Sequence, residues 1–234
     1  MEQQSSGNSE IKSKMAIILF RKMLLVFLIL SFLFSASSQE KVEEGVLYIY
    51  FREEKVGFEE FSWRPDELGY TLEASGQMTK PVPLEISQLV LHLDKSFIPW
   101  KYYFKGSVRG VGQEITSSLS EGDVKNIIRV SGRERESEAK IKRDAFLLPN
   151  AIFSPYLVLT KRFQCSLEES IELSAYIIPQ LELPFTLETK EDYPCCLIMQ
   201  LGGREIEIET DEEGNLRSIV IPSQRLRVAQ NSSR

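Results

Sequence analysis

The chain has 234 residues, of which 42% are hydrophobic and 26% charged, and its 28 Lys and Arg against 34 Asp and Glu give a net charge of −6. This composition excludes a disordered polymer, a collagen-like fibre, a multi-span membrane protein and a strongly basic nucleic-acid binder. Its three cysteines are too few for a disulfide-dense miniature scaffold.

The first 38 residues predict an export signal. A basic pair, Arg21 and Lys22, precedes an apolar run that ends in small residues suited to cleavage after Ser38. The run is about 14 residues long, or about 21 Å as a helix, which is short for a hydrocarbon core of about 30 Å. We therefore predict that residues 1–38 are a leader and signal peptide, with an uncleaved anchor as the alternative. Residues 39–234 are predicted to form a single domain.

Export has consequences for location and partners. The mature chain is expected in the periplasm or outside the cell, or at the inner membrane if the N-terminal segment stays as an anchor. No Cys precedes Cys165, so no lipid-attachment cysteine follows the signal. Without residues 1–38 the net charge is about −8, which does not attract nucleic acid or an anionic membrane surface. We expect no nucleic-acid partner, and membrane contact only through the N-terminal segment.

Alternation of apolar and polar residues dominates the mature chain and predicts antiparallel strands with one face in a core. It is clearest over residues 46–51, 100–105, 205–209 and 225–228. Turn residues separate these runs at short spacing, and the strongest hairpin signals are Gly202-Gly203 and Gly214-Asn215. The pattern predicts a mostly β meander.

One segment departs from the alternation. Apolar residues at helical spacing predict a single helix from about Pro155 to Phe163. Farther on, residues 175–185 contain Pro179 and Pro184, which disfavour a central strand and predict an exposed apolar loop or a sheet edge. Such a loop would expose an apolar patch to an envelope partner. The patch would consist of Tyr176, Ile177, Ile178, Leu181 and Leu183.

Short motifs across residues 45–228 resemble those of exported bacterial domains of unknown function. The motifs are a first strand at 45–51, a second strand with Val56-Gly57-Phe58-Glu59, a strand entry at 97–100, a charged hairpin at 131–142 and a closing hairpin at 211–216. Such families are similar to the lipoprotein-carrier half-barrels. The resemblance implies a curved antiparallel sheet, closed on one side by helix and loops, although only one helix is predicted here.

No catalytic motif stands out. The single histidine, His92, is interpreted as a structural residue of a strand, and a hydrolase that uses it is the least favoured hypothesis. Residues 137–140 match a Ser-x-x-Lys pattern, but their charged flanks favour a hairpin. Glu59 and Glu60 are neighbours whose side chains point to opposite faces of a strand, so they are expected to be solvated. We predict no enzyme and no cofactor.

The cysteines leave three alternatives open. Cys165 could bond to Cys195 or Cys196 in an oxidising compartment, or all three could be buried thiols. A zinc site formed with His92 lacks the paired spacing of zinc ligands. Residues 211–215 lack the spacing of an EF-hand loop and are interpreted as a hairpin turn. No metal site is therefore predicted.

The aromatic residues motivate the leading functional hypothesis. Rings at alternating strand positions would line the hollow of a curved sheet and bind an apolar ligand such as a lipid. The candidates are Phe58, Phe61, Trp63, Tyr70, Trp100, Tyr102 and Phe104. The alternative is that these rings fill the core, as aromatic residues in strands usually do. A second hypothesis is an envelope assembly protein that binds a partner through strand edges and the segment 177–185.

Overall fold

The structure, a computed structural model, describes residues 42–165, 167–179 and 181–230. The predicted leader and its cleavage site lie outside the described residues, so the domain boundary at residue 39 stays a prediction. Within the described part of the chain, no helix is long and apolar enough to cross a membrane.

The first half of the described chain is an antiparallel meander in which each strand pairs with the next. Its strands are β1 (Glu43–Phe51), β2 (Glu54–Pro65), β3 (Gly69–Met78), β4 (Leu84–Asp94), β5 (Pro99–Val108), β6 (Val111–Ser120), β7 (Asp123–Val130) and β8 (Arg133–Lys140). Short turns join them, as the predicted alternation requires.

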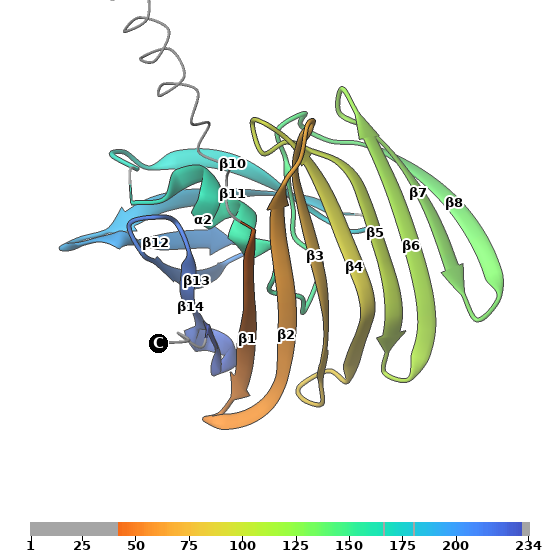
Figure 1. Cartoon of the computed structure of the whole chain (residues 1–234), viewed down its shortest axis with the longest axis horizontal. Coiled ribbons are helices and arrows are strands. Elements are labelled where there is room, and N and C mark those ends of the chain that lie inside the picture. The colour runs from red at the N-terminus through yellow and green to blue at the C-terminus, as the bar shows by residue number, and fades with distance from the viewer. Residues whose placement is uncertain (1–41, 166, 180, 231–234) are drawn as a thin grey trace, which may run out of the picture. The chain divides into compact units, whose positions relative to one another are not determined.

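The second half contains the helix and the remaining strands. These elements are β9 (Phe146–Leu147), α2 (Tyr156–Phe163), β10 (Ile171–Ile177), β11 (Leu181–Lys190), β12 (Tyr193–Leu201), β13 (Arg204–Thr210), β14 (Leu216–Ile221), the 3-10 turn η1 (Pro222–Gln224) and β15 (Leu226–Gln230). The last strand, β15, pairs antiparallel with β1, so both halves belong to one 15-stranded sheet. The sheet is curved and not closed, with β8 and β9 at its edges (Figure 1). The predicted mostly β, half-barrel fold with one helix is confirmed.

The side chains on one face of β1–β5 form the core, because cross-strand neighbours of an antiparallel sheet point to the same side. Leu47 pairs with Glu59 across β1 and β2, and Leu72 pairs with Leu91 across β3 and β4. All four side chains are buried. We call this side the inner face.

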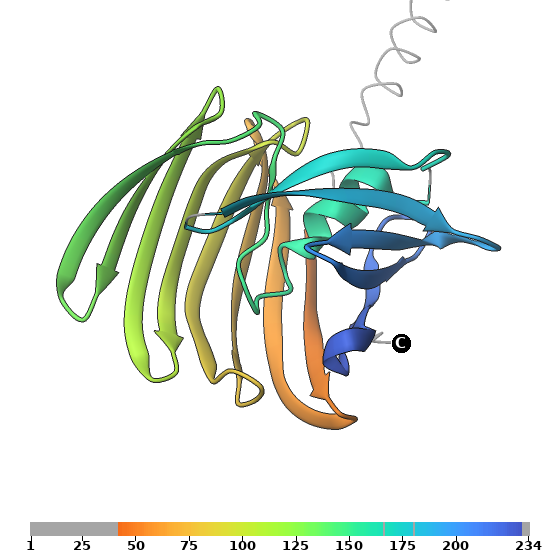
Figure 2. The same ribbon diagram turned by 180° about the vertical axis from the view of Figure 1, so that it is seen from behind.

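Helix α2 lies inside the curve of the sheet, between the two halves (Figure 2). Its first five residues, Tyr156 to Thr160, are all buried, so the helix is covered around its whole circumference at that end. Lys161 forms an ion pair with Glu43 of β1 at 2.5 Å. The helix predicted from Pro155 to Phe163 is confirmed.

The β13–β14 turn packs against the helix. A side chain at Gly214 would place its Cβ 2.7 Å from the carbonyl oxygen of Thr160, and the φ of Gly214 is +75°. Both constraints favour glycine. The Asp211 carboxylate accepts the Asn215 backbone N–H at 2.8 Å, and Asn215 Oδ1 accepts a hydrogen bond from Lys161. Residues 211–215 are therefore a hairpin turn, as predicted.

A polar contact joins the two ends of the sheet. Asn126, buried on β7, donates from Nδ2 to the hydroxyl of Tyr176 on β10 at 2.9 Å. Its Oδ1 accepts the hydroxyl of Ser117 at 2.7 Å, and the Tyr176 hydroxyl donates to the Pro179 carbonyl oxygen at 2.6 Å. Strands β7 and β10 each lie next to an edge strand, so this contact spans the open side of the curve.

The prediction for residues 175–185 is wrong. Strand β11 lies inside the sheet between β10 and β12, and Pro184 belongs to it. Pairing with β12 begins at Phe185, so the proline lies just beyond that ladder and its missing N–H removes no partner there. Of the expected exposed patch, Tyr176 and Ile178 are buried, Ile177 and Leu183 are partly buried, and only Leu181 is exposed.

Candidate functional site

The seven aromatic candidates lie on both faces of the sheet. On the inner face, Trp63 stacks on Tyr70 with ring centroids 5.3 Å apart. The buried members of the set are Phe61, Trp63, Tyr102 and Phe104. Phe58 pairs with Tyr48 on the outer face, and Trp100 stacks on His92 at 4.9 Å. The register of β4 and β5 shifts between His92 and Leu93, which places Trp100 on the side opposite Tyr102.

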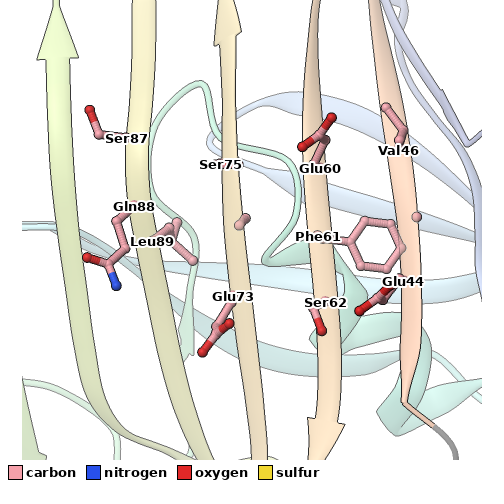
Figure 3. Close-up of a pocket in the computed structure, with 12 residues that line it drawn as sticks. Glu44, Val46, Glu60, Phe61, Ser62, Glu73, Ser75, Ser87, Gln88 and Leu89 are labelled. Atoms are coloured by element: carbon pink, nitrogen blue, oxygen red, sulfur yellow. The ribbon is translucent and has the colours of Figure 1, made fainter.

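A depression on the outer face runs across β1 to β4. Figure 3 shows its side chains lying next to one another on adjacent strands. Three carboxylates, those of Glu44, Glu60 and Glu73, line it together with serine hydroxyls and the amide of Gln88. Phe61 also contributes to its lining, although its side chain is buried. This polar and acidic surface does not suit an apolar ligand.

The candidate site is an apolar cavity of about 640 Å³ between the two halves of the sheet. Its walls come from residues of β1, β3, α2, β10–β15 and η1, from the β3–β4 connection and from residues 148–153. The apolar residues that line it are Phe51, Met78, Pro81, Val82, Leu148, Pro149, Ala151, Ile152, Phe153, Ile177, Leu181, Leu183, Leu201, Ile206, Ile221 and Leu226. We call it the apolar cavity.

Residues of the wrongly predicted loop contribute to this cavity. Ile177, Leu181 and Leu183 lie on the β10–β11 hairpin and line the cavity wall. The side chain of Leu181 is 51% exposed, so the wall is open to water at this end. The segment is apolar, as the sequence indicated, and these three residues line the cavity.

Polar groups are few in the cavity. Among the described residues that line it, Arg204 alone is charged, and Asn150, Tyr156 and Gln224 supply the polar atoms. Burial raises the pKa of the Tyr156 hydroxyl to about 12, while the positive charge of Arg204 acts in the opposite direction. The charge of Arg204 therefore acts on the pKa of this hydroxyl.

Beneath the cavity, Glu59 holds the segment that leads into α2. One carboxylate oxygen accepts the Phe153 backbone N–H at 2.8 Å, and the other accepts the Ser154 N–H at 2.7 Å. The carbonyl oxygens of these two residues accept the N–H groups of Tyr156 and Leu157, so the first helical turn begins here. Glu59 thus satisfies N–H groups that the start of a helix leaves without partners.

The environment of Glu59 is unusual for a carboxylate. Its side chain is fully buried, which corrects the expectation that it is solvated, whereas Glu60 is exposed on the outer face. Burial raises the pKa of Glu59 from 4.5 to about 7, and the hydrogen bonds from Phe153 and Ser154 lower it. Burial and the Glu59 charge together raise the pKa of the Tyr102 hydroxyl.

One of the three cysteine alternatives is present in the structure. Cys165 and Cys195 form a disulfide with Cα atoms 4.4 Å apart, and it links the exit of α2 to β12. Cys196 is a free thiol. Burial raises the pKa of Cys196, which lowers its thiolate fraction and its reactivity.

The residues considered for catalysis lie apart. His92 is on β4 and Ser137 on β8, four strands away, which corresponds to about 19 Å at the usual spacing of strands. His92 contacts the Thr71 hydroxyl at 3.0 Å and stacks on Trp100. Residues 137–140 lie in a strand rather than at a helix start. Within the described residues, no group of His, Cys, Asp and Glu side chains could hold a metal ion.

Comparisons with known proteins add little. No protein-family model matches the chain, and no curated protein matches its sequence. A solved structure of a DUF1089 family protein from Pseudomonas aeruginosa is similar, with 12% sequence identity and a TM-score of 0.41. The match covers 76% of this chain and 90% of that one. The chain is thus similar to a protein from a family of unknown function.

Proposed function

We propose that the protein is a non-enzymatic binding module that holds the acyl chain of a lipid in the apolar cavity. The observation that carries the proposal is an open cavity of about 640 Å³ whose lining residues are mostly apolar. Ligand sites in proteins commonly enclose about 300 to 1,000 Å³ and are lined by apolar side chains with a few polar groups. The resemblance of the sequence to lipoprotein-carrier half-barrels also supports this proposal.

The energetics favour a chain-like ligand. Each methylene moved from water into apolar surroundings contributes about 0.8 kcal/mol, and a flexible chain can follow a cavity formed by several elements. Leu181 at the open end would lose water contact when such a ligand binds. An envelope partner that docks on an exposed apolar loop is less well supported, because Tyr176 and Ile178 are buried in the fold.

Uptake of the neutral dye N-phenyl-1-naphthylamine and mass spectrometry of extracted natively purified protein test the proposal. We expect dye fluorescence to rise on binding and a lipid to be found in the extract. The variant Leu183→Trp fills the cavity and should weaken dye binding at least about tenfold, because it removes space for the chain. A second variant, Leu181→Glu, places a charge at the open end and should act in the same direction.

The matched control is Leu68→Trp. Leu68 is 68% exposed in the β2–β3 turn, at the end of β3 opposite Met78, which lines the cavity. This control should bind dye like the unmodified protein. Absence of both lipid and dye binding in the unmodified protein contradicts the proposal. So does unchanged binding by Leu183→Trp and Leu181→Glu, provided that circular dichroism shows both to be folded.

We further propose that the protein works outside the cytosol, in the periplasm or extracellular space. The leader sequence supports this location, and so does the Cys165–Cys195 disulfide, since disulfides persist in oxidising compartments. Mass spectrometry of the protein from fractionated cells should find a chain that lacks residues 1–38, with this disulfide oxidised. A full-length chain in the membrane fraction would instead indicate an anchor, and a reduced chain in the cytosol would contradict the proposal.

A further inference from the structure

Arg204 is exposed, but it lies in line with two core positions of its strand. It begins β13, where Ile206 and Ile208 follow at alternate positions and are buried on the inner face. Arg204 shares that face because side chains two residues apart in a strand point to the same side. It therefore lines the apolar cavity at its open end, next to the β12–β13 hairpin.

The guanidinium of Arg204 has unused hydrogen-bonding capacity. Among the residues described, it makes no hydrogen bond or ion pair, unlike Arg64, Arg129 and Arg217, which pair with carboxylates. Arginine presents several N–H donors in a planar fork that matches the oxygens of a carboxylate or phosphate. A charge at the rim of an apolar wall has no evident structural task in this fold.

A second donor lies nearby on the helix. The ring of Tyr156 is buried and stacks on Phe153 at 6.5 Å, and Tyr156 is one of the residues that line the cavity. Within the described residues this hydroxyl makes no hydrogen bond, and the charge of Arg204 acts on it. Tyr156 comes from α2 and Arg204 from β13, so two separate elements bring donors to the wall of the cavity.

We propose that the ligand is an anionic amphiphile, with its apolar chain in the cavity and a carboxylate or phosphate head bound by Arg204 and Tyr156. This inference rests on the proposed function and names the class of lipid. The head is recognised locally, because the net charge of −6 repels anions at long range. A hydrogen bond to a charged group is expected to tighten binding about tenfold or more over a neutral head.

The test compares ligands of equal chain length. Dodecanoate, dodecyl phosphate, 1-dodecanol and dodecyltrimethylammonium are each used to displace N-phenyl-1-naphthylamine from the full chain. We expect at least one of the two anions to bind about tenfold tighter than the alcohol, and the cation to bind more weakly than the alcohol. Whichever anion binds tighter identifies the head as carboxylate or phosphate. The preference should decrease as salt increases, since Arg204 is exposed to solvent.

Variants test whether Arg204 causes the tighter binding of the anions. Arg204→Gln should lower the binding affinity for the anions to that for the alcohol, while the affinity for the alcohol stays unchanged. Tyr156→Phe should reduce the preference for anions over the alcohol in part. The matched control is Arg225→Gln, which removes an exposed charge near Gln224 and Leu226 of the cavity wall but does not line the cavity. It should leave the preference intact.

The outcomes separate this inference from the proposed function. If the alcohol binds as tightly as both anions, or if Arg204→Gln weakens alcohol and anions equally, the inference is wrong and the cavity remains a site for neutral chains. If neither the dye nor any of the four amphiphiles binds, the proposed function itself is wrong.

Discussion

Glu59 is a buried carboxyl group whose charge state is coupled to the folding of the chain. Two backbone N–H groups stabilise its ionised form, while complete burial opposes ionisation and dominates. Its pKa is about 7 in the folded protein and near 4.5 when the chain is unfolded. Between these two values the folded state binds the extra proton, so the stability that Glu59 contributes is fully present below pH 4.5 and is lost as pH rises through about 7.

We therefore expect the protein to be more stable at pH 5 than at pH 8, by up to about 3 kcal/mol from this group. Urea unfolding at several pH values measures the effect. Glu59→Gln, which resembles the neutral acid, should lose most of this pH dependence. Glu60→Gln changes an exposed neighbour on the outer face and should retain it. Equal pH dependence in the two variants would show that other groups cause it.

At the scale of elements, most strands of the sheet and helix α2 could be predicted from the sequence. The hairpin at Gly202-Gly203 is present, with both residues at positive φ, because turn chemistry and alternation are local signals. Strand β11 was not predicted, since the effect of Pro184 depends on where the neighbouring ladder begins. That position is set by tertiary pairing and has no signature in the segment itself.

The site was harder to predict than the sheet. Glu59 is buried and alternates with the buried Phe61, and Arg204, although exposed, lies in line with the buried Ile206. A polar residue in line with the core positions of a strand could therefore have marked both residues as candidates from the sequence. The apolar cavity was not predictable, because it is built from loop and strand ends that only the folded chain brings together. The β-bulge that turns Trp100 outward also could not be predicted from the alternation of apolar and polar residues.

At the scale of the whole molecule, side chains rather than a hydrogen-bonded ladder connect the ends of the sheet. Asn126 and Tyr176 join β7 to β10, and the Ser117 hydroxyl completes this buried polar cluster. Such a cluster stabilises a fold only when all its members keep their partners, because a buried polar group without one is costly. The curvature of the sheet should therefore depend on this contact.

Tyr176→Phe tests that dependence. Removal of the hydroxyl deprives the Asn126 amide and the Pro179 carbonyl of a partner and should cost about 1 to 3 kcal/mol of unfolding free energy. Tyr193→Phe, at an exposed tyrosine, should change stability by no more than about 0.5 kcal/mol. The cost of combining Tyr176→Phe with Asn126→Ala should be less than the sum of the single variants. If Tyr176→Phe lowers the free energy of unfolding no more than Tyr193→Phe does, this contact does not stabilise the fold.

The pairing of β1 with β15 imposes an order on the biogenesis of this protein. β1 is the first described strand to be synthesised and β15 the last, yet they are neighbours in the interior of the sheet. A nascent or translocating chain therefore carries an incomplete strand edge until β15 emerges. Premature termination before Leu226 would leave that edge open to a second molecule, which is the geometry from which strand exchange and aggregation start.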